Sequence, residues 1–478
     1  MQSSLSHQTA IQREQPADFV LTRRLIWLYC ILWLIEGALR KWVFPQFSLQ
    51  LLLIRDPLVL VIYASALRAK VFPLNGWLGC LWLIFGLMAI QGFFQAAMGD
   101  VTWAVAAFGV RTFVLHLPLI WVVSAVFGRR EILLLGKWVL LLSPFLAALM
   151  VIQFDVGPDH WLNVGSYKGA KQIGSVEGRI RPPGWFSFVT GPIHFYALCS
   201  ACAIIAFLIK GSLPKWMAAV GVASVLIGMG VAASRGLVMA SAVVGACGAI
   251  AASRSGKGVG AAVGFVIVVV VAFAAMSRFS LMKEGISVFF SRWSYEEEVT
   301  DTGRSTTGMS TMATRYGDGI TKGFYWAARV PIFGYGVGIT SNLAAETMGV
   351  LPPVEQEWER VIYEVGPVTG FLYLGFRTAM ALGLLTLGFS AMRSGNCVSF
   401  VFVGTCILEL LNANLRNPTS TGYLSICCGL TLAALKAFGK DSSESEEGQP
   451  VTEELAVLAA PRPRGRGRFS VGGSPVKP

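Results

Sequence analysis

The sequence predicts an all-α polytopic membrane protein, with about twelve transmembrane helices. Of its 478 residues, 54% are hydrophobic and only 14% are charged, whereas soluble domains carry about a quarter of charged residues. Apolar runs of about 18 residues or more recur along the whole chain, and each is long enough to cross a bilayer as a helix. Composition and hydropathy together exclude an ordinary soluble enzyme.

The first 20 residues are polar and are expected to be a cytoplasmic segment without a removable signal peptide. The predicted spans follow as residues 21–38, 49–66, 74–95, 102–127, 131–152, 186–209, 214–232, 236–252, 258–276, 361–391, 397–413 and 418–437. Residues 21–276 would therefore hold helices 1–9, and residues 361–437 would hold helices 10–12. Between them, residues 277–360 form a long loop, with a short amphipathic helix expected around 316–329.

Charge in the connecting loops predicts the orientation. The short loops that alternate along the chain as LRAKV, FGRRE, KGSLPK, SRSGKG and AMRSGN are all basic. Because cytoplasmic loops are enriched in Lys and Arg, these loops and both termini are expected on the cytoplasmic side. The long loop would then be periplasmic. The tail, residues 438–478, turns from DSSESEE to PRPRGRGR and is expected to be disordered.

Several cations fall at the opposite, non-cytoplasmic face, where Lys and Arg are normally scarce. They are Arg40, Lys41, Arg179, Arg181, Arg235 and Arg416. Two more, Arg55 and Arg111, lie inside apolar spans, where a central Arg costs about 2.5–3.5 kcal/mol on insertion scales. This concentration of positive charge predicts an anionic ligand at that face.

The first span ends in a charged cluster. Glu36 precedes Arg40 by four residues, so the two side chains can pair on one helical face. Arg40 and Lys41 either anchor the helix at the membrane surface or bind phosphate, and the sequence leaves both open. In the second span, Arg55 and the adjacent Asp56 predict a buried pair, while Arg111 needs a partner from elsewhere and His116 is expected to be a satisfied core histidine.

Two further basic sites precede later spans. Arg179 and Arg181 lead into a Pro-Pro-Gly turn, and exposed guanidinium groups bind phosphate through two hydrogen bonds. Arg235 lies in a very short turn, where the amides that open the next helix favour an anion. We predict phosphate binding at both sites, against the alternative of an ordinary basic surface.

Glu357, Arg360 and Glu364 are spaced to share one face of a helix that runs into span ten. A carboxylate held beside an arginine at the boundary of water and lipid can act as a general base on a hydroxyl. A solvated helix start is the alternative. The Gly-rich stretch at 334–338 follows no strand, which argues against a nucleotide site. The nine cysteines are not expected to form disulfides, and the four histidines lack metal-ligand spacing, so no metal and no cofactor are expected.

Taken in order, these motifs resemble bacterial O-antigen ligases and O-antigen polymerase-like (Wzy-type) proteins. The resemblance rests on an Arg-Pro-x-Gly-x-Phe-Ser stretch, a Ser-Arg-Gly turn, Gly-Tyr-Gly-x-Gly and Glu…Arg…Glu-x-Gly-Pro, over most of residues 20–437. The GALRKWVFP stretch is similar to members found with exopolysaccharide assembly. A GT-C-like helical fold in the bacterial inner membrane is what the resemblance implies.

The resemblance also implies a function. Such proteins transfer glycan from undecaprenyl-pyrophosphate at the periplasmic face, without metal or nucleotide sugar, and arginines hold the pyrophosphate. By motif, that role falls to Arg181 and Arg235, and further to Arg40 and Lys41. Family ligases carry a functional histidine in the long loop, and residues 277–360 contain none, which favours a polymerase with Glu357 as the base.

The expected partners are the lipid-linked oligosaccharide, an acceptor glycan, the bilayer and other polysaccharide assembly proteins, with no nucleic acid. A ligase remains the alternative within this class. A flippase for lipid-linked oligosaccharide is the alternative from another class, but it would need cations along a path open to both faces.

Overall fold

The computed structural model describes residues 17–166, 179–232, 234–254, 308–350, 352–354 and 356–439, with isolated residues between 167 and 178 and between 255 and 307. Its named elements within these residues are all helices. The α-helices are α2 (Ala17–Ala38), α3 (Ser48–Leu52), α4 (Arg55–Arg68), α5 (Gly76–Met98), α6 (Trp103–Val114), α7 (Leu119–Val126), α8 (Arg129–Asp155), α9 (Thr190–Leu208), α10 (Lys215–Ala232), α11 (Arg235–Arg254), α14 (Gly308–Ala327), α15 (Asn342–Met348), α16 (Glu357–Arg393), α17 (Cys397–Asn412) and α18 (Pro418–Ala437). Three short turns are η1 (Leu39–Val43), η2 (Pro45–Phe47) and η3 (Trp161–Asn163).

Hydropathy predicted these helices well. Eight segments of the described residues are long and apolar enough to cross a membrane: Pro45–Arg68, Gly76–Met98, Trp103–Val126, Arg129–Asp155, Thr190–Leu208, Lys215–Ala232, Arg235–Arg254 and Glu357–Arg393. The protein is therefore an all-α, multi-pass membrane protein. Helices α2, α17 and α18 also form where spans were expected, although α17 has only 16 residues. The expected span at 258–276 and the predicted disordered tail lie outside the described residues, apart from isolated positions.

The centre of the bundle is built from α9, α17 and α18, whose residues are mostly buried. Helix α9 packs against α8, α10, α11 and α17, while α18 packs against α17 and α7. Small residues allow the closest approaches: a Cβ at Gly404 of α17 would lie 2.9 Å from the Val244 backbone of α11. Close packing at small residues is how helices associate in lipid, where no hydrophobic force drives them together.

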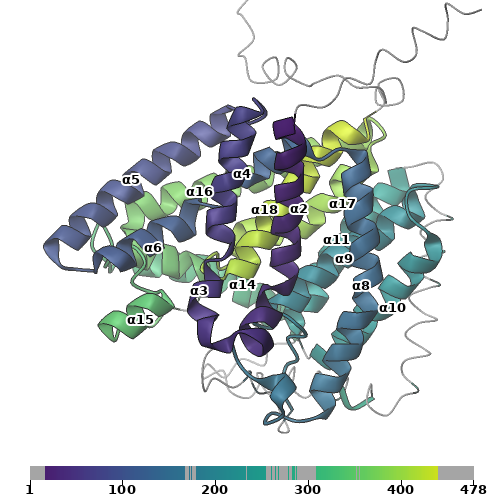
Figure 1. Cartoon of the computed structure of the whole chain (residues 1–478), viewed down its shortest axis with the longest axis horizontal. Coiled ribbons are helices and arrows are strands. Elements are labelled where there is room, and N and C mark those ends of the chain that lie inside the picture. Colours follow the sequence, from purple (N-terminus) through teal and green to yellow (C-terminus); the bar gives the residue numbers. More distant parts are fainter. Residues whose placement is uncertain are drawn as a thin grey trace, which may run out of the picture.

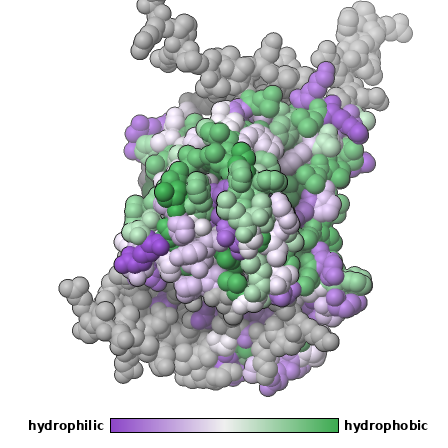
Figure 2. Space-filling view, turned by 90° about the vertical axis from the view of Figure 1, so that its left-hand side faces the viewer, coloured by the Kyte–Doolittle hydropathy of each residue, from purple (hydrophilic) through white to green (hydrophobic). Residues whose placement is uncertain are grey.

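Helix α5 lies at the edge of the bundle, and Figure 2 shows hydrophobic side chains over much of the face that it occupies. Leu83, Ile90, Phe93 and Phe94 are each more than half exposed. In water such a patch would be a liability, but in a bilayer these side chains meet lipid tails. The exposure is thus accounted for by the membrane itself.

Both described ends of the chain lie at one end of the bundle, where α2 begins and α18 finishes (Figure 1). This arrangement is consistent with the expectation that both ends of the chain lie on one side of the membrane. The turns η1 and η2 and the loop before α9 lie at the other end. We call this the cavity end, because the cavity described below opens there.

Helix α16 is bent near its start. Gly366 has φ +73°, and Pro367 follows it, so the residues from Glu357 to Val365 form a short helix set off from the long one. A Cβ at Gly366 would lie 2.0 Å from the Ile332 carbonyl oxygen. The loop 331–341 therefore packs directly on the bend. The amphipathic helix expected around 316–329 is present as α14, where Phe324 contacts Phe371 of α16 with ring centroids 5.0 Å apart.

Candidate functional site

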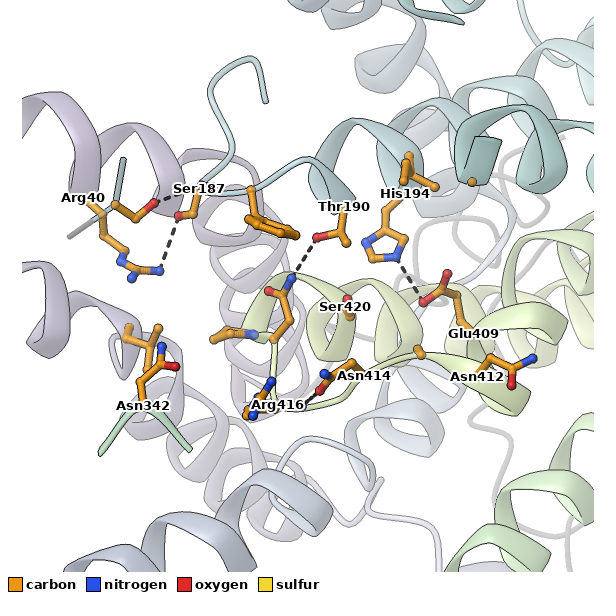
Figure 3. A pocket seen from close by; sticks show the side chains of 18 of the residues that line it. Arg40, Ser187, Thr190, His194, Asn342, Glu409, Asn412, Asn414, Arg416 and Ser420 are labelled. Atoms are coloured by element: carbon orange, nitrogen blue, oxygen red, sulfur yellow. Dashed lines mark hydrogen bonds and ion pairs between the residues drawn. The ribbon is translucent and has the colours of Figure 1, made fainter. Parts of the chain in front are cut away.

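A cavity of about 610 Å³ lies at the cavity end of the bundle (Figure 3). Its lining comes from η1, the segment before α9, the first turns of α9 and α11, and the connection between α17 and α18. The polar side chains that matter most for its chemistry are Arg40, Ser187, Thr190, His194, Glu409 and Arg416. Side chains from distant parts of the sequence therefore converge on one space of ligand size.

The connection between α17 and α18, residues 413–417, supplies one wall. Asn417 caps α18: its Oδ1 accepts from the Thr419 amide at 3.0 Å, and its Nδ2 donates to Thr190 Oγ1 at 2.8 Å. Asn414 Oδ1 accepts from the Arg416 amide at 3.0 Å. These bonds hold a short turn rich in amides against the start of α9.

Arg40 joins the lining from η1 and is buried. Its Nε donates to the Ser48 carbonyl at 3.0 Å, and its Nη1 lies 3.3 Å from Ser187 Oγ and 3.4 Å from Glu36 Oε1. The predicted pairing of Glu36 with Arg40 is confirmed. Glu36 also accepts from Arg55 Nε at 2.9 Å. One carboxylate therefore pairs with two guanidinium groups, and the three side chains together carry a net positive charge.

Arg416 approaches the cavity from the α17–α18 turn. Its Nη1 donates to the Thr340 carbonyl, and Thr340 Oγ1 in turn donates to Glu364 Oε1. Glu364 also accepts from the Gly338 amide at 3.3 Å. The position of Arg416 thus depends on the loop 331–341 and, through it, on α16.

That loop requires glycine. Gly334, Gly336 and Gly338 all have positive φ, and a Cβ at Gly338 (φ +82°) would lie 2.3 Å from the Val105 carbonyl oxygen of α6. The Gly-rich stretch, which was not assigned to nucleotide binding, therefore has a packing role. Its glycines allow the loop 331–341 to contact the backbones of α6 and α16.

Replacing Gly338 by alanine is expected to destabilise the protein by about 1–3 kcal/mol, because it adds backbone strain and a clash with α6. Thermal unfolding in detergent measures the change. Gly349→Ala is the matched control, since Gly349 has φ +68° but open space around its Cα. Equal losses in the two variants would contradict the role given to the contact with α6.

Glu409 and His194 form a pair in the cavity wall. His194 Nε2 lies 3.0 Å from Glu409 Oε2, which joins α9 to the last turn of α17. The imidazole stacks on Tyr423, with ring centroids 4.5 Å apart and an interplanar angle of 11°. His194 is 3% exposed, whereas the Glu409 side chain is 17% exposed. The carboxylate is thus the part of the pair that a ligand can reach.

The predicted catalytic residues lie elsewhere. Glu357, Arg360 and Glu364 do share a face of α16, as expected, but all three are at most 3% exposed and none lines the cavity. Glu357 pairs with Arg360 at 2.8 Å and also with Arg377, and Arg360 lies 3.2 Å from Glu364. Their polar atoms are engaged with one another, which favours a structural part for the network.

The other predicted phosphate ligands are dispersed. Arg179 pairs with Glu284 at 2.6 Å. Arg181 is partly buried, and its Nε has no hydrogen-bond partner among the described residues. Arg235 is the first residue of α11, and its neighbour Gly236 lines the cavity. Of the predicted phosphate ligands, only Arg40 is itself among the lining residues.

Lys41 lies next to Arg40 but points away from the lining. Its Nζ donates to the Gly184 carbonyl at 2.6 Å and lies 4.4 Å from the Trp42 ring centroid. Burial lowers the pKa of Lys41 to about 7. The amine therefore carries less positive charge near neutral pH than an exposed lysine, which makes it a weaker phosphate ligand than the arginines.

The expected pair of Arg55 with Asp56 does not form. Neighbouring residues on a helix point about 100° apart, so they do not face each other. Arg55 instead reaches Glu36, while Asp56 accepts from Arg111 Nη2 at 2.8 Å and lies 3.0 Å from His116 Nε2. The expectations that Arg111 has a distant partner and that His116 is a satisfied core histidine are confirmed.

Sequence reasoning noticed Arg416 as an anomalous cation but gave it no role, and it missed His194 and Glu409. The stretch Asn-Ala-Asn-Leu-Arg-Asn-Pro between two apolar spans was an available signal for the turn at 412–418. No local pattern pointed to Glu409 and His194, which are far apart in the sequence. The cysteines are all free, and among the described residues no three potential ligands are grouped to hold a metal ion.

No family model and no curated protein matches this chain. The geometry of the cavity is therefore the basis for its proposed function.

Proposed function

We propose that this protein is a membrane glycosyltransferase that transfers glycan from an undecaprenyl-diphosphate carrier to the hydroxyl of an acceptor glycan. A polysaccharide polymerase for O-antigen or exopolysaccharide is the leading form. The observation that carries the proposal is the cavity that joins Arg40 and Arg416 at one end of a membrane-embedded helical bundle. In this proposal the bundle lies in the bacterial inner membrane with both termini cytoplasmic, and the cavity faces the periplasm.

Charge supports an anionic donor. Arg40 and Arg416 face a single lining carboxylate, Glu409, among the described residues of the cavity wall. Guanidinium groups match phosphate oxygens in geometry and stay charged at any physiological pH. When the bond from the sugar to the diphosphate breaks, negative charge grows on the leaving oxygen, and fixed cations nearby stabilise that charge most effectively.

The rest of the lining fits a glycolipid. Asn412 and Asn414 offer amide groups, which suit sugar hydroxyl groups. Leu52, Phe108, Phe188, Ile193 and Leu408 give the same cavity apolar walls for a lipid carrier. The cavity thus combines cations for the diphosphate, amide groups for the sugar and apolar side chains for the lipid carrier.

A flippase is the second candidate class, and packing beneath the cavity argues against it. Tyr423, Trp33 and Phe186 are at most 4% exposed, and Trp33 Nε1 donates to the Thr419 carbonyl at 2.9 Å. Further along, Tyr29, His116 and Asp56 are joined by hydrogen bonds. Within the described residues, the space toward the opposite end is therefore filled rather than open, whereas a flippase needs a path through the bundle.

Lipid intermediates in a strain that lacks the protein test the proposal. Loss of a polymerase should leave single repeat units on the lipid carrier in the outer leaflet. Loss of a ligase should leave long polymer on the carrier, and loss of a flippase should leave single units in the inner leaflet. The same protein, purified in nanodiscs, should bind undecaprenyl diphosphate more tightly than undecaprenyl monophosphate.

An unchanged polymer pattern together with no preference for the diphosphate would overturn the proposed function. Long polymer retained on the carrier would move the assignment to the ligase.

A further inference from the structure

Two histidines are buried in carboxylate pairs, and they differ in their hydrogen bonding. His116 uses both ring nitrogens: Nε2 lies 3.0 Å from Asp56 and Nδ1 lies 2.9 Å from Tyr29 Oη. His194 uses only Nε2, toward Glu409, and its buried Nδ1 has no partner among the described residues. Leaving a buried polar atom unpaired costs about 1–3 kcal/mol, so the pair of His194 with Glu409 is less fully satisfied than the pair of His116 with Asp56.

The pair presents its carboxylate to the cavity. Glu409 Oε2 is held by His194, whereas Glu409 Oε1 has no hydrogen-bond partner among the described residues, and the side chain is 17% exposed. The backbone at this point is fixed, because Arg377 Nη2 donates to the Glu409 carbonyl at 2.9 Å and Arg377 Nε donates to the Leu410 carbonyl at 2.9 Å. One carboxylate oxygen is thus free to accept a hydrogen bond, while the rest of the residue is held in place.

The position within the cavity is also suited to a reaction. Figure 3 shows Arg40 and Arg416 toward one side of the cavity, and Glu409 with His194 toward the other. A sugar whose diphosphate lies against the arginines would have the far side of its anomeric carbon turned toward Glu409. In a direct displacement that inverts the anomeric carbon, the attacking hydroxyl approaches from that far side, opposite the leaving group.

We propose that Glu409 is the general base for transfer and that His194 is its positioning residue; this rests on the proposed function. The acceptor hydroxyl gives its proton to Glu409 Oε1 while its oxygen forms a bond to the anomeric carbon. The bond from that carbon to the diphosphate oxygen breaks, and its electron pair leaves with the diphosphate, which the arginines stabilise. The proton then passes from Glu409 to water after the product leaves.

This assignment replaces Glu357 as the residue to test first. Glu357 is 3% exposed and binds Arg360 and Arg377 through both carboxylate oxygens, so no oxygen of Glu357 remains for a substrate hydroxyl. A general base must lie within hydrogen-bond reach of the proton that it takes. Glu409 meets this requirement in the cavity, and Glu357 does not.

The test uses Glu409→Gln in the full-length protein in nanodiscs. The amide keeps an oxygen for His194 but cannot take a proton, so kcat for chain extension should fall by at least about 100-fold. Binding of undecaprenyl diphosphate and the thermal unfolding temperature should stay within the range of the wild-type protein. Glu346→Gln is the matched control, because Glu346 is an exposed carboxylate outside the cavity, and it should leave kcat unchanged.

A second experiment distinguishes a catalytic role of Glu409 from a structural one. Formate should restore part of the turnover of Glu409→Gly, since a small carboxylate can occupy the vacated space and act as the base. His194→Gln should lower kcat less than Glu409→Gln does and should leave donor affinity unchanged.

Different results would contradict the role of Glu409 and the proposed function. Wild-type turnover in Glu409→Gln, or a loss that follows only from unfolding with no rescue by formate, would overturn the role of Glu409 and leave the proposed function standing. A wild-type protein that neither binds the diphosphate carrier nor extends glycan would remove both.

Discussion

Replacing Arg377 by methionine should lower the stability of the protein by about 3–5 kcal/mol, the usual cost of removing one partner from a buried ion pair. Arg377 is 1% exposed, it pairs with Glu357, and it donates to the carbonyls of Glu409 and Ala413 at 2.9 and 3.0 Å. The variant would leave a buried carboxylate short of a partner and several helix-end carbonyls without donors. Thermal unfolding in detergent measures the loss.

The matched control is Arg393→Met, since Arg393 lies at the exposed end of the same helix and should cost little. Combining Arg377→Met with Glu357→Gln should cost less than the sum of the single changes, because the two side chains interact directly. Additive losses, or a stable Arg377→Met protein, would show that the network does not brace the end of α17.

Replacing Arg416 by glutamine should reduce kcat for chain extension by about 100-fold or more, the effect of removing one preorganised group that stabilises developing charge. Arg416→Lys should recover only part of the activity, because an ammonium group lacks the planar fork that matches two phosphate oxygens. Steady-state kinetics with a lipid-diphosphate donor in nanodiscs measure both variants.

Arg329→Gln serves as the matched control for Arg416→Gln. Arg329 is exposed and lies over the Tyr325 ring, at 3.5 Å from its centroid, outside the cavity lining. It should keep the kcat of the wild-type protein. If Arg416→Gln kept it as well, Arg416 would have no part in stabilising the leaving group, and Arg40 would be the cation to examine.

Glu357, Arg360 and Glu364 share one face of α16, as their spacing predicted. This face is buried in a network of ion pairs and lies away from the cavity. Their spacing correctly predicted a shared helical face, because helical periodicity is a local property. Whether that face meets water or protein depends on what packs against it. Here Thr340 binds Glu364, and the Thr340 carbonyl accepts from Arg416. Arg377 pairs with Glu357 and donates to the Glu409 carbonyl. The network therefore supports the cavity on both the Arg416 side and the Glu409 side.

The sequence predicted one anionic site for the cations of the non-cytoplasmic face, but only some of these cations line the same cavity. Arg40 lines the cavity and also pairs with Glu36, Arg179 pairs with Glu284, and Arg181 and Arg235 are not among the lining residues. Burying an unpaired charge is costly, which accounts for the carboxylate partners of Arg40 and Arg179. Which cations remain available to a ligand therefore depends on where the few acidic side chains lie.

Hydropathy alone was enough to predict that the described chain forms apolar helices and, for most of them, where they end to within a few residues. The expected spans 49–66 and 102–127 are instead each interrupted, between α3 and α4 and between α6 and α7. In lipid every backbone amide and carbonyl must be satisfied within its own segment, so local hydropathy is enough to specify a helix. The contact of Glu409 with His194, and the shared cavity of Arg40 and Arg416, could be recognised only in the folded chain. Side-chain partners come from helices far apart in the chain, and their meeting depends on how small residues let those helices pack.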